Sequence, residues 1–137
     1  MTVMGKHNGV KQSKGERAMN IKKLALLGLA GALGLAGAVE AGRIPGPGID
    51  TRRCEAYSSV TYHDTFRRGR IAVVSIVGDG DTDLDLFVYD RFGNLVARGI
   101  GLTDRETVRW VPPTTGTYRI VVRNLGGVWH RFSLATN

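Results

Sequence analysis

Residues 71–89 read IAVVSIVGDGDTDLDLFVY and predict two β-strands joined by an acidic turn. The first part, residues 71–77, is a nearly continuous run of β-branched apolar residues, which is typical of a strand buried on both faces or central in a sheet. The second part, residues 84–89, alternates instead, so that its two leucines and Val88 point to one face. We therefore expect an all-β fold.

Further segments with strand character follow at short intervals, separated by turns rich in Gly, Pro, Asn and Asp. Residues 91–94 predict a tight hairpin turn. No segment downstream of the N-terminal region has a helical period. The pattern predicts six or seven strands packed as a β-sandwich or barrel. The further strands are expected at residues 57–62, 95–98, 106–111 and 118–122, with a last strand whose buried face is Val128, Phe132 and Leu134.

Residues 1–41 predict a signal peptide with an N-terminal extension before Met19. A lysine pair precedes residues 24–39, which are uncharged, and small residues then allow cleavage after Ala38 or Ala41. The alternative is an uncleaved membrane anchor, but a spanning helix needs about 20 strongly apolar residues, and this run is shorter and contains four glycines. We expect an exported protein, either secreted or held in the periplasm or cell envelope, with membrane contact only through an uncleaved signal.

The net charge of +7 does not predict a nucleic-acid partner, because of where the basic residues lie. All five lysines precede residue 24, so the strong basicity belongs to the N-terminal segment. Residues 42–55 are expected as a linker, since Pro45 and Pro47 cannot donate backbone hydrogen bonds. Residues 56–137 then form one small domain, which has room for a two-layer core but not for a deep catalytic cleft as well.

Several motifs follow one another in the order found in one protein family. Residues 78–86, GDGDTDLDL, form an acidic turn that ends in DLDL. VYD follows at residues 88–90 and GN at residues 93–94. A proline pair at residues 112–113 then precedes GTYRIVV at residues 116–122. Over residues 64–136 the sequence resembles the bacterial pre-peptidase C-terminal domain. This resemblance implies a β-sandwich of jelly-roll type, associated with secretion, substrate binding or adhesion; some collagenase-attached relatives bind collagen and calcium. Such domains usually accompany a peptidase, and we expect none here, so the partner would be another molecule.

The acidic turn is the candidate metal site. Asp79, Asp81 and Asp83 recur at every second position, and an extended backbone would place their carboxylates on one side. Ca²⁺ takes about six to eight oxygen ligands, so these three residues are the candidate ligands, joined by Asp104 or Glu106 from another loop. The alternative is structural, because aspartates in turns accept hydrogen bonds from nearby backbone N–H groups. We expect the fold to need no cofactor, with Ca²⁺ as the one candidate.

The sequence supplies no recognisable catalytic site. His63 and His130 lie outside any G-x-S-x-G or H-E-x-x-H motif; we expect His63 in a surface loop and His130 packed at a strand edge. Cys54 is the only cysteine, so it is either a buried unpaired thiol or half of an intermolecular disulfide. We therefore do not expect an enzyme.

Binding is the function class that remains. Trp110 is in phase with Val108 and is expected in the core, whereas Trp129 is out of phase with its neighbours and is the candidate exposed aromatic of a ligand-binding platform. Arginine clusters at residues 52–53 and 67–70 are either solvated charges beside strand edges or a polyanion-binding patch. We predict a binding or adhesion module for an extracellular protein or polysaccharide; the alternative is a structural or assembly module of the cell envelope. The sequence leaves the oligomeric state open.

Overall fold

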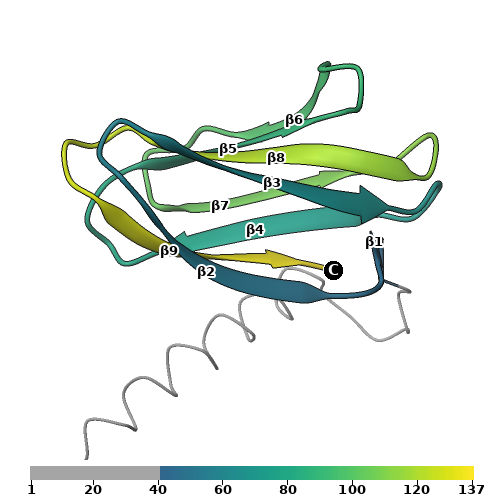
Figure 1. Ribbon diagram of the computed structural model, residues 1–137, viewed down its shortest axis with the longest axis horizontal. Coiled ribbons are helices and arrows are strands. Elements are labelled where there is room, and N and C mark those ends of the chain that lie inside the picture. Colours follow the sequence, from purple (N-terminus) through teal and green to yellow (C-terminus); the bar gives the residue numbers. More distant parts are fainter. Residues whose placement is uncertain (1–40) are drawn as a thin grey trace, which may run out of the picture.

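The computed structural model describes residues 41–137, so the predicted signal peptide lies outside the described residues, except for Ala41. Two antiparallel sheets form this part of the chain, with the strand orders β1-β3-β8-β5-β6 and β2-β9-β4-β7. Figure 1 shows them as two stacked layers. Between residues 41 and 137 there is no helix that could cross a membrane. The strands are β1 (Arg43–Ile44), β2 (Gly48–Cys54), β3 (Ser59–Phe66), β4 (Ala72–Gly78), β5 (Leu84–Tyr89), β6 (Leu95–Gly99), β7 (Arg105–Trp110), β8 (Gly116–Asn124) and β9 (His130–Thr136).

The core lies between the two sheets and draws on both. Leu84, Leu86 and Val88 point inward from β5 and are fully buried, as the alternation predicts. The four-stranded sheet contributes apolar residues of β4 and β9 to the same cluster. Burial of each such side chain stabilises the fold by about 1.5–3 kcal/mol. Because the only cysteine is a free thiol, no disulfide adds to this stabilisation, and the sandwich depends on the packing of its core.

Aromatic rings close the core beside the β3–β4 loop. The Phe66 ring meets the Trp110 ring edge-on at a centroid distance of 4.8 Å, and Trp110 lies 5.4 Å from the Tyr118 ring. The predicted core position of Trp110 is confirmed, since it packs against the buried cluster. The prediction for β4 is also confirmed, because residues 72–76 are buried on both faces of the strand.

The segment expected as a linker, residues 42–55, instead contributes strands to both sheets. β1 pairs with the end of β3, and β2 pairs with β9 along its whole length. The two prolines lie between β1 and β2 and account for the interruption there. They do not prevent β2 from pairing, because every residue of β2 after Pro47 has a backbone N–H group. Most of β2 is polar and exposed, as an edge strand allows, so its sequence lacks the alternation of a half-buried strand.

Smaller differences concern the ends of elements. β3 begins two residues after the predicted start and extends to Phe66, so His63 lies in a strand and not in a loop. Val128, expected on a buried face, lies before β9 in a loop and is 51% exposed.

Cys54 is buried, with its thiol 3.4 Å from the Ser58 carbonyl oxygen, and burial raises its pKa. The buried-thiol interpretation is confirmed.

Candidate functional site

Four loops meet at one end of the sandwich, on the left of Figure 1. Backbone hydrogen bonds join the β2–β3 loop to the β8–β9 loop (3.1 Å), and the β8–β9 loop to the β4–β5 loop (3.2 Å). A third bond joins the start of β5 to the β6–β7 loop (3.3 Å). We call this surface the four-loop end; its loops are residues 55–58, 79–83, 100–104 and 125–129.

Asn124 holds three of these loops together from the end of β8. Its side chain is 1% exposed, and its amide donates to the carbonyl oxygens of Glu55 (3.2 Å) and Val128 (2.7 Å). Its side-chain oxygen accepts hydrogen bonds from the Thr82 hydroxyl (3.0 Å) and the Gly126 N–H (2.9 Å). A buried amide with its donors and acceptor all used fixes the loops in one arrangement.

The acidic turn is attached to β9 through His130. The Asp79 carboxylate lies 2.8 Å from Nδ1 of His130 and also accepts the Arg131 N–H (3.1 Å). On the other side of the ring, Nε2 is 2.9 Å from the Thr82 backbone nitrogen. His130 is fully buried, and its contacts are those of a residue that anchors the turn.

The three predicted metal ligands have different surroundings. Asp79 is engaged by His130 and by the backbone, Asp81 is exposed, and Asp83 keeps one buried carboxylate oxygen without a hydrogen-bond partner among the described residues. Asp104 does approach the turn, as predicted, but it accepts the Gly80 N–H at 2.6 Å. Within residues 41–137 no group of three or more His, Cys, Asp or Glu side chains is arranged to hold a metal ion. The contacts of Asp79 and Asp104 are those of the structural alternative.

Exposed aromatic residues gather on two of the four loops. Tyr57 is 77% exposed, and its hydroxyl lies above Gly127, where an added Cβ would come within 3.0 Å of it. Trp129 is 42% exposed, as the sequence predicts, and the Arg53 guanidinium lies 4.4 Å from the centre of its ring. A backbone hydrogen bond joins the two loops, and we call their exposed residues Tyr57, Val128 and Trp129 the aromatic patch.

Tyr57 is the aromatic residue of this patch that the sequence does not reveal. The sequence predicts it as the first residue of a strand, but it precedes β3 and has a left-handed backbone with φ of 53°. It is the only non-glycine residue with positive φ among residues 41–137. Such a conformation is uncommon for a tyrosine, and the surrounding contacts hold it there, including the hydrogen bond from its N–H to the Gly126 carbonyl.

Comparison with known proteins adds a likeness of fold. No known protein family matches the sequence, and no curated protein does. The pre-peptidase C-terminal domain of a collagenase from Bacillus anthracis is similar in structure, with a TM-score of 0.52 and 12% identity over 64% of this chain and 88% of that one. A periplasmic inhibitor of g-type lysozyme from Aeromonas hydrophila, PliG, has a TM-score of 0.47 and 13% identity over 76% of this chain and 92% of that one. The chain thus has a fold similar to that of a pre-peptidase C-terminal domain.

Proposed function

We propose that this chain is an exported, non-catalytic binding module that recognises an extracellular protein or polysaccharide through the aromatic patch. The observation that carries the proposal is the pair Tyr57 and Trp129, both exposed on adjoining loops that buried contacts hold in place. Exposed Tyr and Trp side chains supply large contact areas at a small cost in conformational entropy. The Arg53 guanidinium over the Trp129 ring restricts that ring before a ligand arrives.

We further assign the chain to the pre-peptidase C-terminal type, with jelly-roll connectivity. The strand orders support this assignment, because each sheet takes strands from both halves of the chain, as two interleaved Greek keys require. The motif order of residues 64–136 and the similar collagenase domain point the same way. Export rests on the predicted signal peptide of residues 1–41.

The test is a binding assay with the full exported protein against immobilised cell-wall polysaccharide and collagen. We expect one of the two to retain the protein, and we expect Trp129→Ala and Tyr57→Ala each to weaken retention about tenfold or more, as for residues central to an interface. Phe92→Ala is the matched control. Phe92 is 75% exposed and carries the Arg91 guanidinium 4.6 Å from its ring, but it lies in the β5–β6 loop, at the opposite end of the sandwich. If all three variants lose retention equally, or if none of them loses it, the aromatic patch is not the binding surface.

A structural or assembly role is the second candidate function, and one surface favours it. The edge strand β6 and the loop after it expose Leu95, Ile100 and Leu102, the last being 93% exposed. An edge strand with apolar side chains can pair with a second chain. Light scattering during gel filtration measures the oligomeric state. A dimer that becomes a monomer in the Leu102→Glu variant would support assembly through β6.

A further inference from the structure

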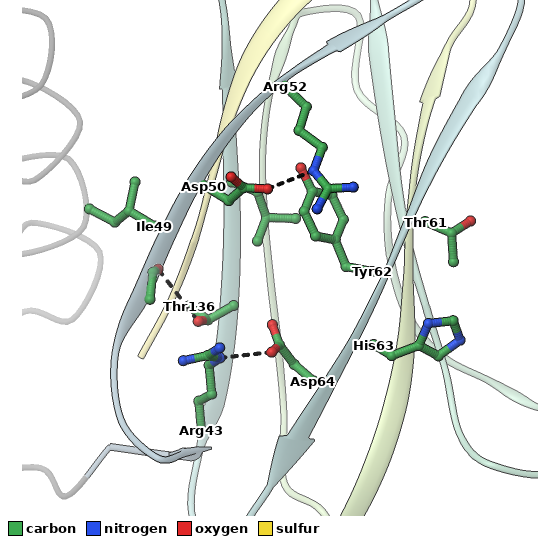
Figure 2. Close-up of a pocket in the computed structure, with 11 residues that line it drawn as sticks. Arg43, Ile49, Asp50, Arg52, Thr61, Tyr62, His63, Asp64 and Thr136 are labelled. Carbon is green, nitrogen blue, oxygen red and sulfur yellow. Dashed lines mark hydrogen bonds and ion pairs between the residues drawn. The ribbon is translucent and has the colours of Figure 1, made fainter.

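A polar groove opens on the side of the sandwich where β2 and β3 diverge (Figure 2). Its volume is about 360 Å³, within the range of roughly 300–1,000 Å³ that is usual for small-ligand sites. Both strands leave a backbone edge open here. Among residues 41–137, β2 pairs with β9 alone, and β1 covers β3 only at residues 65–66. The groove lies outside the four-loop end and shares no residue with the aromatic patch.

The groove walls carry strong charges that cancel. The Arg43 guanidinium lies 2.9 Å from the Asp64 carboxylate, and the Arg52 guanidinium lies 2.7 Å from that of Asp50. Figure 2 shows the two ion pairs one above the other along the groove. Two cations matched by two anions give no net attraction for a polyanion or a polycation. They do present fixed donors and acceptors beside one another, which a ligand with paired donor and acceptor groups can use.

Tyr62 lines the groove with a hydroxyl group that the protein leaves unsatisfied. This hydroxyl is buried and has no hydrogen-bond partner within the described part of the chain. The Asp50 carboxylate lies close enough to act on it by its charge and by a weak hydrogen-bonding contact, but the alignment of that contact is too poor to satisfy the hydroxyl. Burial raises the pKa of Tyr62, and the Asp50 carboxylate raises it further, so the hydroxyl keeps its proton and remains a donor. The half-exposed Arg52 side chain places its guanidinium over the Tyr62 ring, 4.7 Å from the ring centre.

Inward-pointing charges on edge strands also protect a sheet from pairing with other chains, and this accounts for Asp50 and Arg52. It does not account for the Tyr62 hydroxyl, because phenylalanine would pack the same ring against Phe132 without burying an unpaired donor. A buried donor without a partner calls for a separate explanation, and a ligand that accepts its hydrogen bond supplies one.

We propose that the groove between β2 and β3 binds a neutral saccharide of one or two rings, whose hydroxyl groups pair with the Arg43–Asp64 and Asp50–Arg52 side chains and accept a hydrogen bond from Tyr62. A sugar hydroxyl both donates and accepts, so it suits a groove that offers carboxylates and guanidiniums together. To reach Tyr62 the ligand displaces the half-exposed Arg52 side chain, whose guanidinium remains available to another hydroxyl. This site is independent of the aromatic patch, so either proposal can fail without the other.

The experiment is an amide NMR titration of the exported protein with three probes: cellobiose, maltose and N,N′-diacetylchitobiose. We expect at least one to bind at millimolar concentration or below and to shift the amide signals of residues 48–52 and 61–64. Tyr62→Phe should weaken this binding about tenfold, the value of one hydrogen bond, without lowering the melting temperature of the free protein. A purely structural tyrosine would show the opposite pattern, with a lower melting temperature and unchanged binding.

Trp129→Ala is the matched control and should leave the groove titration unchanged, which separates this site from the proposed patch. Diglycine and dextran sulfate serve as the competing ligand classes. The proposal is overturned if none of the three sugars shifts these amides, if diglycine or dextran sulfate does so in their place, or if Tyr62→Phe binds the sugar as tightly as the native protein.

Discussion

Gly78 ends β4 at a point where no side chain fits. An added Cβ would lie 2.6 Å from the Asp104 carboxylate and closer still to the His130 ring, so both residues that hold the acidic turn would have to move. We predict that Gly78→Ala lowers the free energy of unfolding by about 1–3 kcal/mol, as overpacking does elsewhere, measured by urea denaturation. Gly116→Ala is the control, because nothing lies within 4 Å of its Cβ position. Equal destabilisation by both substitutions would contradict this account of the turn.

Two aspartates are predicted to respond to pH in opposite directions. Burial raises the pKa of Asp85, and Asp83 and Glu106 raise it further, so ionisation of Asp85 disfavours the fold. This penalty is absent below the ordinary pKa of 3.8 and grows as the pH rises through the raised value. Asp85→Asn should therefore stabilise the protein at neutral pH and have no such effect in acid. Hydrogen bonds, first from the Asn94 side chain (3.0 Å), lower the pKa of Asp90.

Asp90 thus contributes stability that is present above the ordinary pKa of 3.8 and is lost as the pH falls through its lowered value. Asp90→Asn should destabilise the protein at neutral pH, with the difference from native disappearing in acid. Urea denaturation of both variants between acid and neutral pH measures the two trends. Changes of the same sign for Asp85→Asn and Asp90→Asn would show that the environments of these carboxylates have been misassigned.

At the scale of elements, β8 fixes the loops as well as the five-stranded sheet. Asn124→Asp keeps the shape of the side chain but removes both N–H donors, which leaves the part-buried carbonyl groups of Glu55 and Val128 without this partner. We predict a loss of about 2–4 kcal/mol and faster hydrogen exchange of loop amides at the four-loop end. The control is Arg105→Ala on the exposed face of β7, which should change stability by less than about 0.5 kcal/mol. Unchanged loop protection in Asn124→Asp would refute the role of the amide.

The strands differ in how far their sequences reveal them. β5 occupies residues 84–89, as predicted, because the inward positions Leu84, Leu86 and Val88 recur at every second residue and so mark a strand locally. β2 escaped prediction because its pairing partner β9 is about 80 residues away and its own edge position permits a polar sequence. The acidic turn was found as a motif, but its contact with His130 depends on the topology that brings β9 beside β4. The left-handed backbone of Tyr57 has no sequence signal at all.

For the molecule as a whole, we predict that Ca²⁺ at millimolar concentration leaves the melting temperature unchanged. One oxygen of Asp79 already contacts His130 and the other accepts the Arg131 N–H, so a metal ion at Asp79 would compete with the contacts that attach the turn. Thermal melting followed by circular dichroism, with EDTA and with Ca²⁺, measures the difference. A rise in melting temperature with Ca²⁺ that Asp81→Asn abolishes would restore the metal site that the sequence suggests.

The last prediction concerns the start of the mature chain. Among residues 41–137, the first contacts that close the sandwich are made by Gly42, whose carbonyl oxygen accepts the Arg67 N–H at 2.8 Å, and by Arg43, whose N–H donates to the Asn137 carbonyl at 2.7 Å. Cleavage after Ala38 or Ala41 would therefore leave both of these contacts intact. We predict that the intact mass of protein exported from a bacterial host corresponds to a chain starting at residue 39 or 42. Ala41→Lys should shift cleavage to Ala38 or block it, and an unprocessed chain in the membrane fraction of the native protein would instead establish the N-terminal segment as an anchor.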